Sequence, residues 1–359
     1  MPLALSFARS PSTPTLLAWM LGIAVLLTVA DVQESSAQRR RSRSSASKSK
    51  ESSRSAAAQA LKADEKAGTI GALLQEYPFE VKKIRLKRAD IAYMDEGSGE
   101  EVLVFVHGLN GYAPIWGKQL AVLKERYRCV AVDLPGYGRS SKGRDFPMSI
   151  FSCADLLIRF MDALKLQRVT LVGHSMGGQI ALNVAMRYAG RVKKLVLVAP
   201  TGLEPFSEKE RQAFHDNVTE ELTKNKTEEQ IQNDFRKLFY QIPADSSANF
   251  LLKDRLAMRD ASDFGDYCLA VKQSILGVID MPTYDMLDGV PQSTLLMFGH
   301  NDGYIPNPFF HVGQKSEEIA AIGKQRLRYC KVIMLPKCGH MAQIEQPEAV
   351  NKAILDFVK

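Results

Sequence analysis

The stretch that decides the fold is VTLVGHSMGGQIALNVAMRY, residues 169–188. It opens with a short apolar run typical of a strand, and the residues after Gly178 have the apolar periodicity of a helix. Ser175 lies between the two, flanked by glycines that permit a tight turn. A G-x-S-x-G pattern alone is weak evidence, but the strand before it and the helix after it predict a strained turn that exposes the serine hydroxyl. The alternative is a glycine-rich turn in which Ser175 only caps the helix.

Strands and helices alternate on both sides of this turn. We expect strands at 81–86, 91–94, 102–106, 128–132, 169–172, 194–198, 294–298 and 329–334, and helices at 150–164, 176–188, 308–322 and 347–358. This alternation predicts an α/β fold with a mostly parallel sheet and helices on both faces. Residues 201–290 contain several amphipathic helical stretches and no convincing strand. We therefore expect a helical cap there, inserted between two parts of one core, residues 78–200 and 291–359.

The first residues have the pattern of an export signal. Residues 15–30 are apolar or small and follow Arg9, which is typical of a signal peptide spanning 1–37 and cleaved after Ala37. Cleavage after Ala30, an uncleaved anchor and a misassigned start are the alternatives. Residues 38–77 are a basic, low-complexity linker with a short helical lead-in. The sequence predicts a periplasmic or secreted protein, in which this linker either binds an anionic membrane surface weakly or is simply solvated.

Charge and cysteine content exclude several classes of function. The net charge is +7, but residues 1–60 contain eight Lys or Arg and three acids, so little positive charge remains elsewhere. The folded part is therefore not expected to bind nucleic acid. The five cysteines are odd in number and lie mostly in apolar runs, which predicts buried free thiols. No metal-ligand spacing or phosphate-binding motif is present, so no metal and no cofactor are expected. The oligomeric state is left open.

Four further motifs each follow a predicted strand. They are His107-Gly-Leu109, Asp133-Leu-Pro-Gly-Tyr-Gly-Arg-Ser140, Gly299-His-Asn-Asp-Gly-Tyr-Ile-Pro306 and Gly339-His340. Together with the turn at Ser175, they make the chain resemble enzymes of the α/β-hydrolase fold over about residues 80–358. The resemblance implies a nucleophile, an acid and a histidine in that chain order.

The resemblance assigns three catalytic residues. Ser175 is the nucleophile, His340 the general base and Asp302 the acid that orients it. His300 is the rival base and Glu204 the reserve acid, whereas Asp302 could instead be only a turn residue. The backbone N–H groups of Leu109 and Met176 are expected to form the oxyanion hole.

The expected activity is hydrolysis of an ester in a small, largely apolar molecule. The serine at the turn argues against relatives such as haloalkane dehalogenases, which have an aspartate there. Carbon–carbon bond hydrolases, lipases, perhydrolases and acyltransferases share the same three residues and stay open. The alternative of another class is a non-catalytic ligand-binding protein built on this fold.

Overall fold

The structure is a computed structural model that describes residues 68–87, 89–281 and 283–359. The predicted signal peptide and residues 38–67 of the linker lie outside the described residues, so export and membrane association stay predictions. Within the described ranges, no helix is long and apolar enough to cross a membrane.

The described residues form one eight-stranded sheet with the order β1-β2-β4-β3-β5-β6-β7-β8. The strands are β1 (Lys82–Leu86), β2 (Ala89–Glu96), β3 (Val102–Val106), β4 (Arg128–Val132), β5 (Val169–His174), β6 (Val192–Val198), β7 (Ser293–Gly299) and β8 (Cys330–Leu335). β2 is antiparallel to both β1 and β4, and all other neighbours run parallel. The α/β fold and its mostly parallel sheet are confirmed, and each predicted strand ends within two residues of the observed one.

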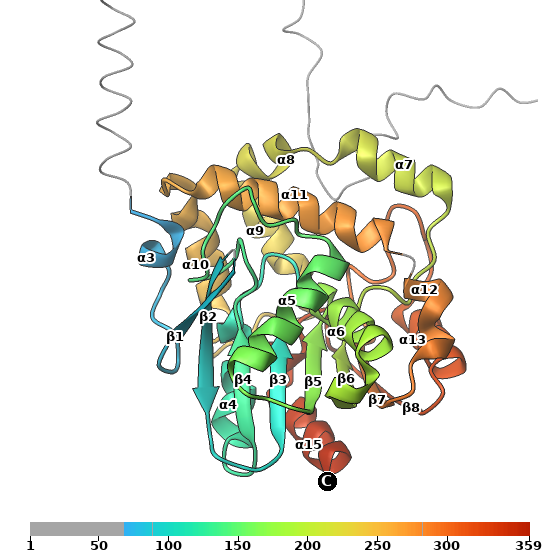
Figure 1. Cartoon of the computed structure of the whole chain (residues 1–359). Helices are drawn as coiled ribbons and strands as arrows, with labels where there is room; N and C mark the ends of the chain where they lie inside the picture. The colour runs from blue at the N-terminus through green and yellow to red at the C-terminus, as the bar shows by residue number, and fades with distance from the viewer. Residues whose placement is uncertain (1–67, 88, 282) are drawn as a thin grey trace, which may run out of the picture.

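Helices cover both faces of the sheet (Figure 1). α5 (Ile150–Ala163) and α6 (Met176–Arg187) pack together on one face, and α4 (Gly117–Leu123) packs with α15 (Pro347–Val358) on the other. α13 (Ser316–Arg326) packs on β7 and β8. The shorter elements of the core are α3 (Ile70–Leu73), η2 (Ala113–Trp116), η3 (Ala189–Arg191) and α14 (Ala342–Glu345).

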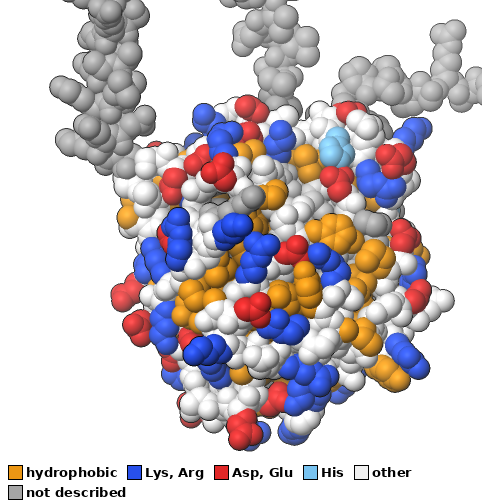
Figure 2. Space-filling view, viewed as in Figure 1, with side chains coloured by type: hydrophobic (Ala, Val, Ile, Leu, Met, Phe, Trp, Pro, Cys, Tyr) orange, Lys and Arg blue, Asp and Glu red, His pale blue; other side chains and the backbone are white. Residues whose placement is uncertain are grey.

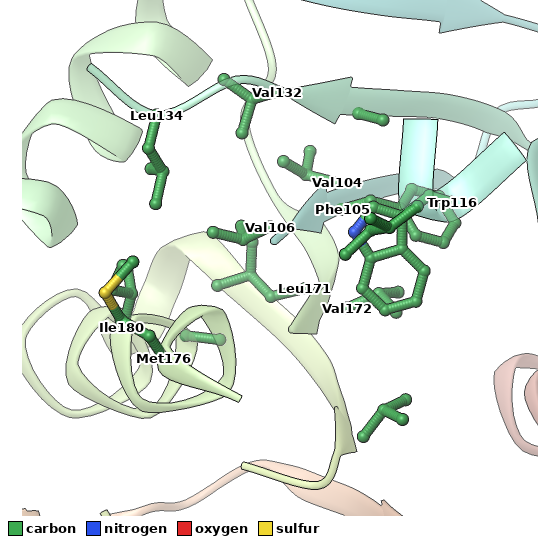
Figure 3. Packing of buried hydrophobic residues seen from close by; sticks show 14 of the residues in the cluster. Val104, Phe105, Val106, Trp116, Val132, Leu134, Leu171, Val172, Met176 and Ile180 are labelled. Atoms are coloured by element: carbon green, nitrogen blue, oxygen red, sulfur yellow. The ribbon is translucent and has the colours of Figure 1, made fainter. Parts of the chain in front are cut away.

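Apolar side chains fill the space between the sheet and its helices (Figure 3). Trp116 is fully buried, and its ring centroid lies 5.3 Å from that of Phe105 on β3. On the other side, Met176 and Ile180 of α6 pack toward β3 and β5 (Figure 3). All five cysteines are buried and free, as predicted. Burial on both faces explains why the central strands are apolar throughout.

Between β6 and β7 the chain is helical. The structure describes every residue of this stretch except 282, and it contains no strand among the described ones. The elements are α7 (Glu208–Asn217), α8 (Glu220–Lys224), α9 (Glu228–Lys237), α10 (Asn249–Ala257), η4 (Met258–Asp260), α11 (Phe264–Asp280), α12 (Thr283–Met286) and η5 (Leu287–Gly289). We call residues 201–290 the helical segment. Figure 1 shows α7, α8 and α11 above the carboxyl ends of the parallel strands. On the face shown in Figure 2, basic and acidic side chains are interspersed, with hydrophobic side chains exposed between them.

The helix predicted at residues 308–322 is wrong in its first half. The Asn307 side chain accepts hydrogen bonds from the N–H groups of Phe309 and Phe310, at 3.0 and 3.1 Å. Gly313 then adopts a φ of +84°, which no right-handed helix contains. α13 therefore begins only at Ser316, and Pro308 opens a turn. His311 lies in this turn instead of on a helix, with 13% of its side chain exposed.

Candidate active site

Ser175 occupies a strained turn between β5 and α6, with φ of +53° and ψ of −120°. The turn is tight: a Cβ on Gly177 would lie 2.3 Å from the carbonyl oxygen of Val106, so only glycine fits. The Ser175 side chain makes no capping hydrogen bond to α6, which contradicts the alternative that it serves only as a cap. No side chain in the described residues hydrogen-bonds to its hydroxyl. The missing bond does not exclude a catalytic role, because hydrogen bonds between catalytic groups often tighten only when substrate binds.

Asp302 and His340 meet at the carboxyl end of the sheet. Asp302 follows β7 and His340 follows β8, and Nδ1 of His340 lies 2.8 Å from Oδ2 of Asp302. The other carboxylate oxygen accepts from the N–H groups of Tyr304 and Ile305, at 2.9 and 3.0 Å. Asp302 is therefore a turn residue, as one alternative held, and a partner of the histidine as well. The Asp302 side chain is fully buried, so its carboxylate is held in one orientation.

His174 connects the loop of His340 to the turn of Ser175. Its Nε2 lies 3.1 Å from the carbonyl oxygen of His340, to which it donates, and the two ring centroids are 4.7 Å apart. Burial holds the pKa of His174 well below its usual value. The His174 ring is therefore neutral and adds no positive charge beside His340.

The rival residues found from the sequence have other partners. His300 is 40% exposed and pairs with Glu317 on α13. Glu204 pairs with His311 and accepts from the N–H of Asn307 at 2.5 Å, and burial raises its pKa. Neither of them contacts His340, so the geometry favours Asp302 as its partner.

Replacing Asp302 by asparagine is expected to lower kcat by roughly 10³ to 10⁴-fold, because an amide no longer favours the Nδ1–H tautomer of His340. Glu204→Gln, the matched control in the same cavity wall, should change kcat by less than about tenfold, since it removes a charge that pairs with His311 and not with His340. Steady-state kinetics on any ester that the protein turns over would measure both. An equal loss in the two variants would contradict the choice of acid.

Leu109 and Met176, the expected oxyanion-hole residues, line the same cavity as Ser175. Met176 is the first residue of α6, so its N–H has no acceptor within the helix. Gly108 lies against Ser175, because a Cβ built on it would be 2.7 Å from that of Ser175. The N–H of Gly111 donates to the carbonyl of Gly108 at 3.1 Å, which closes a turn over Leu109 and leaves the Leu109 N–H free.

The His107 side chain forms hydrogen bonds that hold this turn in place. Its Nδ1 lies 2.8 Å from the carbonyl of Gly108, and its Nε2 accepts from the N–H of Leu134 at 2.9 Å. Asp133, also buried, accepts from the N–H groups of Ala113 and Arg139. Both residues therefore hold loops in place beside the site.

His107 should make the protein less stable in acid. Burial lowers its pKa from 6.5 to about 4, so between these values the unfolded chain binds a proton that the folded protein does not. The free energy of unfolding should therefore fall as the pH drops from 6.5 to 4, by about 3 kcal/mol from this group. His107→Gln, which can still accept from Leu134 but does not titrate, should show a shallower fall. Urea unfolding at a series of pH values would measure this, and equal slopes would contradict it.

A cavity of about 460 Å³ opens at this site. Its wall includes Ser175, His340, Leu109 and Met176 from the core. The helical segment contributes residues from α7 to α11, among them Phe214, Leu222, Phe235, Leu251 and Val271. Of the residues named from the sequence, Glu204 is also part of this wall, whereas Asp302 and His300 are not.

Two residues of the cavity wall, Tyr304 and Asn110, have contacts that suggest a role which the sequence did not predict. Tyr304 packs against the ring of His340, with centroids 5.4 Å apart, and donates to the carbonyl of Asp234 on α9 at 2.9 Å. Asn110 directly follows Leu109, and an asparagine among glycines at a turn is a signal for the positive φ that it adopts.

The family model of the α/β hydrolase fold matches residues 101–347. The chain belongs to the α/β hydrolase family. The match begins at the strand before His107 and extends past His340, so it includes every residue of the candidate site. The sequence motifs had indicated this family at a few short segments, and the family model matches most of the folded chain.

Relatives in this family have diverse names. The chain is 28% identical to a pimeloyl-[acyl-carrier protein] methyl ester esterase of Nitrosospira multiformis, over 73% of this chain and 96% of that protein. It is also 28% identical to a dihydrolipoyllysine-residue acetyltransferase component of the acetoin cleaving system of Pseudomonas putida, over 73% of this chain. The match spans 65% of that second protein, slightly under two thirds of its length.

Among solved structures, a probable hydrolytic enzyme of Pseudomonas aeruginosa PAO1 matches with a TM-score of 0.71. The alignment covers 82% of this chain and 99% of that one at 22% identity, so it shows a shared fold.

Proposed function

We propose that this α/β hydrolase cleaves an ester bond of a small, largely apolar substrate through an acyl-enzyme on Ser175. One observation carries the proposal: Nδ1 of His340 is paired with buried Asp302 at 2.8 Å, while the ring borders the same cavity as Ser175. The pairing leaves Nε2 of His340 without a proton and able to accept one.

In the first half of the reaction, Oγ of Ser175 bonds to the ester carbonyl carbon and its proton passes to Nε2 of His340. The carbonyl electron pair moves onto oxygen, where the N–H groups of Leu109 and Met176 donate to the negative charge. Each such donor typically contributes about 3 kcal/mol in the transition state. The intermediate then expels the alkoxide, which takes the proton from His340 and leaves as an alcohol. Asp302 stabilises the imidazolium between these two transfers.

In the second half, a water molecule gives a proton to His340 and attacks the acyl carbon. The new intermediate releases Oγ of Ser175, which takes back that proton, and the acid leaves. The groups that performed the first half therefore perform the second in the same roles, and no cofactor is required.

The cavity wall supports an apolar substrate. Phe214, Phe235, Leu251 and Val271 lie on four different helices of the helical segment, which we propose to act as the cap over Ser175. Burial of each substrate methylene against such a wall contributes roughly 0.8 kcal/mol, so uncharged acyl groups are favoured over charged ones. The name of the Nitrosospira multiformis relative, a methyl ester esterase, agrees with ester cleavage.

A fluorophosphonate probe and a panel of uncharged p-nitrophenyl esters would test this proposal. We expect covalent labelling of Ser175 and release of p-nitrophenol. Absence of both would indicate a binding protein instead of an enzyme. Labelling with product formed only when an alcohol acceptor is added would indicate acyl transfer, the alternative with the same three residues.

A further inference from the structure

Asn110 stands at a position in the turn where glycine would be less strained. The Gly108–Gly111 hydrogen bond closes the turn, and Asn110, its third residue, has φ of +58°. Positive φ at the third residue of such a turn is adopted most easily by glycine, and among other residues by asparagine. The backbone therefore permits asparagine without requiring it, and the contacts of its amide show whether the side chain has a further role.

The Asn110 amide is oriented by a rigid neighbour on the helical segment. Oη of Tyr267, on α11, donates to Oδ1 of Asn110 at 2.8 Å. Tyr267 is 2% exposed, and its ring stacks on Phe264, with centroids 5.9 Å apart. The guanidinium of Arg255 lies over the same ring, 5.3 Å from its centroid. Because Tyr267 is held from several sides, it fixes Oδ1 on its own side and turns Nδ2 away.

The open side of the amide is the cavity. Asn110 is an exposed residue of the cavity wall, whereas Tyr267 is not part of that wall. In the described part of the chain, no group accepts a hydrogen bond from Nδ2. The preceding residue, Leu109, provides the proposed oxyanion donor, and successive Cα atoms are about 3.8 Å apart. An acceptor bound by Nδ2 would thus lie within a few bonds of the reacting carbonyl.

We propose that Asn110 selects substrates whose acyl group carries a second, uncharged oxygen close to the ester carbonyl, such as an ether, hydroxyl or keto oxygen. Nδ2 of Asn110 donates to that oxygen, and Tyr267 is the positioning residue that aims the amide. The inference rests on the proposed ester hydrolysis. It adds one polar requirement to an apolar pocket, because an acyl chain made of carbon alone leaves this donor without an acceptor.

Two isosteric esters would measure this selection. p-Nitrophenyl butyrate and p-nitrophenyl methoxyacetate differ by one methylene replaced with an ether oxygen. The ratio of their kcat/KM values is compared between proteins, so the intrinsic reactivity of each ester cancels. Asn110→Gly, which keeps the positive φ, should lower the methoxyacetate preference roughly three- to tenfold, the range for one hydrogen bond.

Tyr267 supplies the coupling test. Tyr267→Phe should lower the same ratio, and the double variant should lose no more than Asn110→Gly alone, because both changes remove one linked pair. Tyr137→Phe is the matched control: its hydroxyl donates to Ser274 at 2.8 Å, and its ring lies 5.8 Å from that of Tyr267. This control should leave the ratio unchanged.

An unchanged ratio in Asn110→Gly would overturn the inference, and so would an equal fall in Tyr137→Phe, which would indicate general loosening of the packing. Failure of the unmodified protein to react with either ester or with the fluorophosphonate would instead overturn the proposed function.

Discussion

Ser175→Ala is expected to lower hydrolysis by roughly 10⁵ to 10⁶-fold, while the protein stays folded. The loss is this large because Oγ is the atom that we propose to bond to the substrate. Residual activity would come from the N–H groups of Leu109 and Met176, which the substitution does not remove. Ester hydrolysis assays together with far-UV circular dichroism would measure activity and folding in the same preparation.

Fluorophosphonate labelling followed by peptide mass spectrometry provides the control for Ser175. The label should be found on the peptide that contains residue 175 and should be absent from Ser175→Ala. Labelling of a different serine at full rate in the variant would show that the nucleophile lies elsewhere.

His340→Ala is expected to lower kcat to a similar extent as Ser175→Ala, because residues that act as one unit lose function together. The substitution removes the imidazole that pairs with Asp302 and that we propose to accept the proton of Ser175. The double variant should therefore be little worse than either single one. Steady-state kinetics of the three proteins would measure this, and additive losses would argue against a shared role.

His300→Ala is the matched control, since it removes the same ring from a loop at the same edge of the sheet. His300 is 40% exposed and pairs only with Glu317, so activity should stay within about threefold of the unmodified protein. The reverse outcome, loss with His300→Ala and retention with His340→Ala, would show that the order of residues along the chain was misread.

The strands were predictable because their physical signature is local. A strand buried on both faces needs an unbroken apolar run, and VLVFV of β3 or LVLV of β6 shows this directly. The same holds for α15, whose proline at the first turn marks its start. Pro308 carries the same signal for a helix start, but the helix predicted there was wrong. The side chain of Asn307 and the positive φ of Gly313 form a turn instead, and their effects depend on the surrounding structure.

The candidate residues were found by another kind of reasoning. Ser175 could be located because its turn requires glycines in sequence around it. Asp302 and His340 are 38 residues apart and were named through resemblance to a family, since nothing local distinguishes His340 from His300. Their contact follows from the order of β7 and β8 in the sheet, which places both loops at one edge.

By itself the sequence determined the α/β fold, the position of the strained serine and the burial of the cysteines, because each depends on patterns within a few neighbouring residues. Only the tertiary structure decided which acid meets His340, that Glu204 and His300 pair elsewhere, and that Tyr267 orients Asn110 across 157 positions of the chain. Such pairings depend on the distance in space between two side chains, and the number of residues between them in the sequence does not predict that distance. A hydrogen bond forms only within about 3.2 Å, and folding alone brings these groups that close.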